Sequence, residues 1–299
     1  MSETQYEHVH PELRSYLKLP SAERITLNIR IPFANYPLAD RHLKRLLHYA
    51  TMPQVDRMPC GLIFGPSNNG KTTILGEFGN LFAKQTLDAP LERKQAWVRV
   101  LAPPHADEAR LCMEVLTALN APLARTSTAR EVSTDAQFHL RSSGVQLLLI
   151  DEFQHLITGT KAQVRVAMNA VKNISTKLQI CIVGCGLPTA FNAIHSDPQV
   201  ENRFYPMELP AWSYGDDFKQ LLIRLEARLL LREPSNLSSA VSARVIHTRT
   251  DGLIGEAIAL LAAASKFALQ EGRECITGKD LSSCEYLGPG ERRKRFMTQ

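Results

Sequence analysis

Nine consecutive residues, 65–73, constrain the fold of this chain more than any other stretch. They read GPSNNGKTT, with a short apolar run before them at residues 62–64 and helical spacing of apolar residues after them. A glycine-bounded loop between a strand and a helix, ending in Lys-Thr, is typical of a loop that binds the phosphates of a nucleotide. Glycines let backbone N–H groups approach phosphate oxygens, and the N-terminus of the following helix adds partial positive charge.

The loop predicts particular contacts with a nucleoside triphosphate and a metal ion. The ammonium of Lys71 is expected on the β- and γ-phosphates, and the hydroxyl of Thr72 is expected to ligate Mg²⁺. We therefore predict ATP and Mg²⁺ as cofactors. A glycine turn that merely joins a strand to a helix is the alternative interpretation. The predicted nucleotide-binding residues of the loop are Gly65, Pro66, Ser67, Asn68, Asn69, Gly70, Lys71, Thr72 and Thr73.

A second informative stretch, VQLLLIDEFQHL, occupies residues 145–156. Its continuous apolar run is typical of a strand that is buried on both faces of a parallel sheet, and it ends in Asp151 and Glu152. A carboxylate at the end of a strand beside a phosphate loop can hold Mg²⁺, so Asp151 is predicted as a metal ligand together with Thr72. Glu152 is predicted to orient and activate a water against the γ-phosphate. Acidic pairs also simply end strands, and the upstream loop is what favours the catalytic interpretation.

The order of the remaining patterns predicts the fold class. Strand-like and helix-like segments alternate between residues 62 and 209, which predicts an α/β sandwich with a mainly parallel sheet, and strand signals cease after Trp212. The expected strands cover residues 62–64, 96–101, 147–150, 178–183 and 205–209. The expected divisions are an N-terminal extension at 1–30, a nucleotide-binding αβα domain at 31–210, a helical lid at 211–286 and a basic tail at 287–299.

Composition adds weaker constraints. The 299 residues carry a net charge of +5, which permits a polyanionic partner without requiring one. The basic run at residues 292–295 is interpreted either as a solvated tail or as a contact for DNA or an acidic partner. Six cysteines without C-x-x-C spacing, and no signal-peptide pattern or membrane-length apolar run, predict a cytoplasmic protein with reduced thiols and no membrane contact.

Four stretches resemble the AAA+ ATPases, and more closely the TniB/TnsC branch of transposition regulators. They are RMPCGLIFGPSNNGKTT (57–73), LLLIDEFQHL (147–156), MNAVKNISTKLQICIVGCG (168–186) and NRFYPMELPAW (202–212), supported by the later DGLIGEAIALLAAASKFAL. The resemblance implies an ATP-dependent regulator that forms homo-oligomers, as rings or helical filaments, on duplex DNA. It implies two further partners, a DDE transposase of the TniA/TnsB type and a TniQ-like targeting protein. It also implies a slow ATPase, stimulated by DNA or partners, whose hydrolysis step drives disassembly.

The resemblance also assigns catalytic roles to Lys71, Glu152 and Arg203. Arg203 matches the arginine finger, which would reach the γ-phosphate of a neighbouring subunit in trans; a surface or helix-capping arginine is the alternative. Two departures favour slow hydrolysis. Cys185 stands where the sensor strand usually ends in Thr, Ser or Asn, and residues 253–256 read LIGE where the lid often carries an arginine.

The resemblance implies that DNA is held through its backbone, without sequence-specific base contacts. The segment after the second strand offers the candidates Arg110, Arg125, Thr126 and Arg130, for which a solvated loop is the alternative. Two other functions stay open. One is a helicase loader or insertion-sequence helper ATPase of the IstB/DnaC type, and the other is an adaptor that binds ATP without hydrolysing it.

Overall fold

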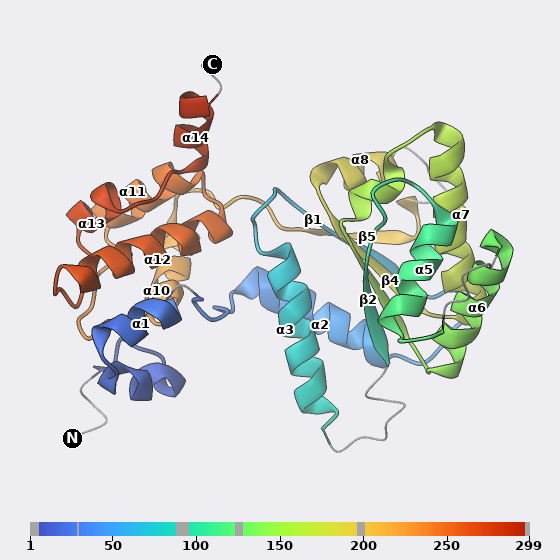
Figure 1. Cartoon of the computed structure of the whole chain (residues 1–299), viewed down its shortest axis with the longest axis horizontal. Helices are drawn as coiled ribbons and strands as arrows, with labels where there is room; N and C mark the ends of the chain where they lie inside the picture. Colours follow the sequence, from blue (N-terminus) through green and yellow to red (C-terminus); the bar gives the residue numbers. More distant parts are fainter. Residues whose placement is uncertain (1–5, 29, 88–95, 123–127, 196–200, 297–299) are drawn as a thin grey trace. The chain divides into compact units, whose positions relative to one another are not determined.

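The computed structural model describes residues 6–28, 30–87, 96–122, 128–195 and 201–296 of the chain. It separates into two compact units (Figure 1). The first, here called the α/β unit, comprises residues 38–67 and 71–209. The second, the helical unit, comprises residues 1–37, 68–70 and 210–299. Three segments are grouped differently from the limits expected from the sequence, because residues 1–37, 68–70 and 287–299 all fall in the unit of the C-terminal helices.

The α/β unit is built on a five-stranded sheet with the order β2-β3-β4-β1-β5, and every neighbouring pair of strands is parallel. This arrangement confirms the predicted α/β class. The carboxyl ends of all five strands lie at one edge of the sheet, here called the carboxyl edge, and their first residues lie at the opposite, amino edge. The strands are β1 (Cys60–Phe64), β2 (Trp97–Leu101), β3 (Leu147–Asp151), β4 (Cys181–Gly186) and β5 (Phe204–Glu208).

Side chains alternate between the two faces of the sheet, and each face has its own helices. Leu62, Leu148 and Ile182 belong to the core on one face, which also includes residues of α5 (Glu108–Ala118), α6 (Ala129–Ser142), α7 (Lys161–Leu178) and α8 (Pro188–His195). The other face carries Trp97, whose ring packs edge-on against Phe78 of α3 (Lys71–Gln85), with 5.1 Å between the ring centroids. Helix α2 (Pro37–Thr51) lies on that face too, since Arg45 stacks over Tyr205 of β5.

The boundary of β4 differs from the predicted strand at residues 178–183. Helix α7 continues to Leu178, because this residue and Ile180 are buried where the helix turns into the strand. Gln179 caps the helix in the left-handed conformation with φ 53°, and β4 starts only at Cys181. An apolar run alone does not distinguish the buried last turn of a helix from the start of a buried strand.

A buried ion pair joins the segment at residues 6–28 to the rest of the helical unit. Residues 11–18 form a 3₁₀ helix and α1 (Ser21–Asn28) follows it. Arg24 of α1 is 1% exposed and donates two hydrogen bonds, of 2.6 and 2.7 Å, to the carboxylate of Glu274. Val9, Leu17 and Leu230 form a small apolar cluster beside it. The remaining helices are α10 (Asp216–Glu226), α11 (Ala240–Thr250), α12 (Ile254–Gln270), α13 (Gly278–Ser283) and α14 (Pro289–Phe296).

The basic run near the C-terminus lies on α14 and is partly neutralised within the helical unit. Arg292 contacts the carboxylate of Glu256 at 2.5 Å, and Arg293 contacts Asp251 at 2.7 Å. Within the described part of the chain, no single helix is long and apolar enough to cross a membrane, although the bent pair of α11 and α12 together meets that criterion by length and composition.

Candidate nucleotide-binding site

The backbone geometry of the loop at residues 65–73 favours glycine at both of its glycine positions. Gly65 follows β1, and a Cβ atom at this position would lie 2.1 Å from the carbonyl oxygen of Leu209. Any other residue would therefore push the end of β5 away. Gly70 adopts φ +80°, a conformation that glycine reaches without strain, and α3 begins at the next residue. The strand, loop and helix of the sequence prediction thus follow one another as expected.

The ammonium of Lys71 lies inside the loop. Its Nζ atom donates to the carbonyl oxygens of Gly65 at 2.9 Å and Pro66 at 2.6 Å. Burial lowers the pKa of Lys71, while the nearby acidic groups, Glu152 and Asp151 among them, act in the opposite direction. The side chain is thus held in place by backbone oxygens, close to acidic groups at the carboxyl edge.

Three polar side chains converge at the end of β3. Asp151 is 5% exposed, and its Oδ2 atom accepts from the hydroxyl of Thr72 at 3.3 Å. The same oxygen accepts from Arg99 at 2.5 Å, while Oδ1 accepts from the backbone N–H of Glu152 at 3.0 Å. A hydroxyl and a carboxylate at this separation are the hard oxygen ligands that Mg²⁺ prefers, so these residues fit the predicted ion.

Arg99 was not predicted as part of the site. It lies on β2 in register with Leu149 of the neighbouring β3, and its guanidinium neutralises Asp151. The sequence holds one signal that could have found it, since an arginine between Val98 and Val100 is unusual in a strand whose neighbours are buried.

Glu152 has a strained backbone that its neighbours hold in place. It adopts φ 54° and ψ 39°, the left-handed region, directly before the 3₁₀ helix at Phe153–Ile157. Its carboxylate accepts a hydrogen bond from the side-chain amide of Gln154. The amide oxygen of Gln154 in turn accepts from the backbone N–H of Leu187, just after β4, at 3.1 Å. Strained backbone of this kind is frequent at functional sites, and Gln154 fixes the orientation of the acid.

Cys185 lies on β4, paired in register with Ile63 of β1, and is fully buried. Burial raises the pKa of the Cys185 thiol well above its usual value, and the negative charge of Asp151 raises it further. The thiol therefore stays neutral beside Asp151 and Lys71. A neutral thiol is a weaker hydrogen-bond partner than the Thr, Ser or Asn that the resemblance leads one to expect here.

Arg203 is not brought together with the other candidate catalytic residues. It directly precedes β5 at the amino edge and donates to the hydroxyl of Thr176 at 3.1 Å. Lys71 follows the opposite edge, and a five-residue strand spans about 15 Å. Arg203 therefore cannot complete the site of its own subunit, which is consistent with a role in trans.

Two of the four DNA candidates lie near one another. Glu108 at the start of α5 accepts from Ser133 at the start of α6 at 3.1 Å, so the first turns of these helices are neighbours. Arg110 and Arg130 belong to those turns, although Arg110 also lies 3.6 Å from Asp107. Arg125 and Thr126 lie outside the described residues.

In the helical unit, the segment that lacks the lid arginine holds the middle of the loop by other means. The backbone N–H groups of Gly255 and Ile254 donate to the backbone oxygen of Asn68 at 3.0 Å and to the side-chain oxygen of Asn69 at 3.3 Å. The carboxylate of Glu256 accepts from the Asn68 amide at 3.0 Å. The first turn of α12 thus fixes loop residues through neutral donors and an acid instead of a cation.

Comparisons with known proteins agree with this geometry. The family model described as bacterial TniB protein matches residues 24–214, which is more than half of the chain. The chain belongs to the TniB family. No match was found among curated proteins. The family assignment confirms the resemblance drawn from the four sequence stretches.

Several solved structures share the fold of this TniB-family chain. ORC2 of Aeropyrum pernix, in ADPNP-ADP complexes, is 19% identical, has a TM-score of 0.60, and is matched over 86% of this chain and 68% of that one. Cdc6p of Pyrobaculum aerophilum is 18% identical with a TM-score of 0.61, over 85% of this chain and 68% of that one. ORC1 of Aeropyrum pernix, in complex with DNA, is 16% identical with a TM-score of 0.63, and is matched over 85% of this chain and 65% of that one. These likenesses confirm the predicted AAA+ fold with its helical C-terminal region.

Proposed function

We propose that this TniB-family chain is an ATP-dependent, DNA-binding regulator of DNA transposition. The observation that carries the proposal is the convergence of Lys71, Thr72 and Asp151 around a loop whose glycines are required by the backbone, in a chain of this family. Structures of the same fold were solved with ADP and its analogue and with DNA, which supports the same two ligand classes here.

In the proposed reaction, the chain hydrolyses ATP to ADP and phosphate. Lys71 and the N–H groups of the loop hold the phosphates, and Thr72 and Asp151 hold Mg²⁺, which would neutralise charge on the phosphate oxygens. Glu152 accepts a proton from the water whose oxygen attacks the γ-phosphorus, while the bond to the ADP oxygen breaks. Because Gln154 holds the carboxylate of Glu152 and Cys185 supplies only a thiol, this step is slow.

The proposal further includes assembly. Arg203, at the amino edge of one subunit, completes the site of the next, so that bound ATP favours a ring or helical filament of identical subunits. Arg110 and Arg130, together with Arg125 and Thr126, contact the phosphates of duplex DNA from that assembly in the cytoplasm. ATP-bound assemblies recruit a DDE transposase and a TniQ-like targeting protein, and hydrolysis dismantles them.

The non-hydrolysing adaptor is a second candidate, and one observation favours it. The catalytic acid of the first proposal, Glu152, already accepts a hydrogen bond from Gln154 in the same segment. If this bond persists with ATP bound, the acid cannot approach the attacking water. The chain would then act as an ATP-bound adaptor whose assembly is not reversed by turnover.

Phosphate release with and without duplex DNA distinguishes the two candidates. We expect slow release by the natural chain that increases with DNA, and a decrease of at least about 100-fold in Glu152→Gln. The same variant is expected to retain ATP-dependent DNA binding, measured by fluorescence anisotropy. Absence of phosphate release by the natural chain with DNA present would contradict the ATPase proposal and support the adaptor. Loading of a replicative helicase onto DNA would instead support the helicase-loader interpretation.

A further inference from the structure

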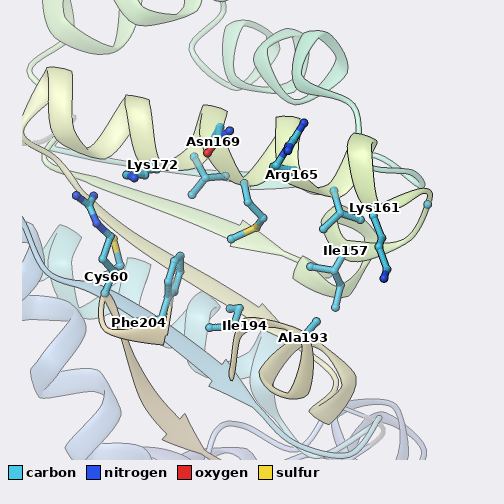
Figure 2. A pocket seen from close by; sticks show the side chains of 14 residues that line it. Cys60, Ile157, Lys161, Arg165, Asn169, Lys172, Ala193, Ile194 and Phe204 are labelled. Carbon is cyan, nitrogen blue, oxygen red and sulfur yellow. The ribbon is translucent and has the colours of Figure 1, made fainter. Parts of the chain in front are cut away.

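A groove in the α/β unit lies away from the phosphate loop and has no part in the proposed reaction apart from Arg203. It has a cavity volume of 480 Å³ and runs between α7 and a wall formed by α8 and the first residues of β1 and β5 (Figure 2). Fourteen residues of the described part of the chain line it, and none of these fourteen is acidic.

The floor of the groove is apolar. Cys60, Met168, Ile194 and Phe204 belong to the main core cluster of the α/β unit and form part of the lining. Met168 and Phe204 are each 9% exposed, at the limit of that core. The floor is thus the outer layer of the core, against which an apolar side chain in the groove could pack and so leave water.

The rim is cationic. Lys161, Arg165 and Lys172 come from α7, and Arg203 lies at the amino edge of the sheet. Among the described residues, no carboxylate forms an ion pair with any of the three α7 cations. Some exposed basic side chains of the α/β unit do have such a partner, as Lys44 does with Asp40 at 2.6 Å.

The spacing of these cations fits an elongated ligand. Lys161, Arg165 and Lys172 follow one another along α7 above the apolar floor, with Asn169 between the last two (Figure 2). The eleven helical steps from Lys161 to Lys172 span about 17 Å, which matches five or six residues of extended chain. In an extended chain, successive side chains point to opposite sides, so apolar residues can face the floor while acidic residues reach the rim. The amide of Asn169 can bond to the backbone of such a chain.

We propose that this groove binds a short, extended, acidic segment of a partner protein in which apolar and acidic residues alternate. Charge complementarity selects the acidic residues, and the floor selects the apolar ones. Duplex DNA would satisfy the cations but leave the floor exposed, because it presents phosphates and no apolar side chain to a concave surface. The inference does not depend on ATP hydrolysis, since the α7 cations and the floor lie outside the phosphate loop.

The test uses the full chain and a fluorescein-labelled peptide, Glu-Leu-Asp-Phe-Glu-Leu, in fluorescence polarisation. We expect saturable binding that weakens as salt increases, and a loss of at least about tenfold in affinity in the double variant Lys161→Glu, Arg165→Glu. Ala193→Trp, which fills the groove without changing its charge, is expected to weaken binding to a similar extent. Lys84→Glu on α3, a single charge reversal on the other face, is expected to leave the affinity unchanged, while Lys161→Glu alone is expected to weaken binding.

The specificity of the groove is tested with two further probes. Lys-Leu-Lys-Phe-Lys-Leu and Glu-Ser-Asp-Ser-Glu-Ser are both expected to bind at least about tenfold more weakly than the acidic-apolar peptide. Equal binding of either probe, unchanged affinity in the double variant, or no saturable binding would overturn the proposal. Competition by a 20-base-pair duplex, lost in the double variant, would assign the cations to DNA and also overturn it. Binding is expected to be the same in Lys71→Ala, so this test and that of the ATPase can fail separately.

Discussion

Charged side chains at the carboxyl edge of the sheet have partners within the chain, whereas the rim cations along α7 have no acidic partner among the described residues. At the carboxyl edge, Lys71 donates to two loop carbonyls, Asp151 is shared by Thr72 and Arg99, and Glu152 is held by Gln154. Along α7, the rim cations of the groove have no acidic partner among the described residues. The first arrangement places the groups that we propose to bind the nucleotide in position before a ligand arrives. The second leaves positive charges that no carboxylate of the described residues neutralises.

This difference separates two ways in which a surface is prepared for binding. Groups held by internal hydrogen bonds lose little freedom when a nucleotide binds, which is the condition for electrostatic catalysis. Cations on a helix surface that form no ion pair among the described residues are not held in place before binding. They would contribute to affinity through charge complementarity with a partner instead.

Subunit mixing gives the largest expected effect and tests the one candidate catalytic residue outside the carboxyl edge. Arg203→Ala should reduce DNA-stimulated phosphate release by about 1,000-fold or more, because an arginine finger stabilises the charge of the transition state. Glu152→Gln should be similarly inactive. Because each variant keeps the group that the other lacks, a mixture of the two should recover part of the activity if Arg203 acts on a neighbouring subunit.

The control for this mixture is a double variant that carries both substitutions. When the double variant is mixed with Arg203→Ala, no subunit supplies the arginine. When it is mixed with Glu152→Gln, no subunit supplies the acid. Neither mixture can therefore form a complete site between two subunits. Recovery of activity in that control, or none in the original mixture, would contradict a role for Arg203 in trans.

Removal of a cation from a buried ion pair should lower the stability of the protein much more than removal of an exposed cation that has no acidic partner among the described residues. Arg24→Ala would remove the closest cation from Glu274 and leave it only Arg232, at 3.7 Å, which should cost about 3 kcal/mol in the free energy of unfolding of the helical unit. Arg165→Ala should change stability by less than about 0.5 kcal/mol. The two tryptophans fall in different units, so a Trp97→Phe background lets the fluorescence of Trp212 report urea unfolding of the helical unit. Similar losses in both variants would remove the contrast between paired and unpaired cations.

Gln154→Ala tests whether the hydrogen bond between Gln154 and Glu152 slows ATP turnover. Removal of the amide frees the Glu152 carboxylate to approach a water, so phosphate release should increase by about threefold to tenfold. The double variant Gln154→Ala, Glu152→Gln should be inactive, which shows that the gain acts through the acid. A decrease in Gln154→Ala would mean instead that the hydrogen bond holds Glu152 in its productive orientation.

The smallest effect concerns acid stability. Burial raises the pKa of Glu274, but hydrogen bonds and charge from Arg24 and Arg232 outweigh it and hold the pKa below its ordinary value of 4.5. The ionised Glu274 therefore stabilises the helical unit above about pH 4.5, and this contribution is lost as the pH falls through the lowered pKa. Urea midpoints at pH 7, 5, 4 and 3, followed through Trp212, should fall more steeply in the natural pair than in Arg24→Ala. Parallel curves would contradict this assignment.

The main parts of the candidate site at the carboxyl edge could be predicted from the sequence because they are local. A loop with its own glycines and an apolar strand ending in two acids each carry their meaning within a few residues. The parallel sheet followed from the alternation of apolar strands with helices. The AAA+ fold and the TniB family were both recognisable from such stretches, and both are confirmed.

Features that depend on contacts between residues far apart in the sequence could not be predicted from local patterns. Arg24 appeared to belong to a polar extension because its partner, Glu274, lies 250 positions along the chain. Arg99 and Gln154 entered the site only through the register of β2 with β3 and the path of the chain after β4. The α7 groove could not be predicted, because cations spaced along a helix become a rim only when an apolar floor lies beside them.

Assembly on DNA with and without an intact phosphate loop tests the central claim most directly. Electron microscopy of the chain with duplex DNA and a non-hydrolysable ATP analogue should show rings or filaments for the natural chain. Lys71→Ala should bind the analogue about 10- to 100-fold more weakly and form no such assemblies at the same concentrations. Assemblies of Lys71→Ala equal in number and form to those of the natural chain, and indifferent to nucleotide, would contradict the claim that bound ATP holds the subunits together.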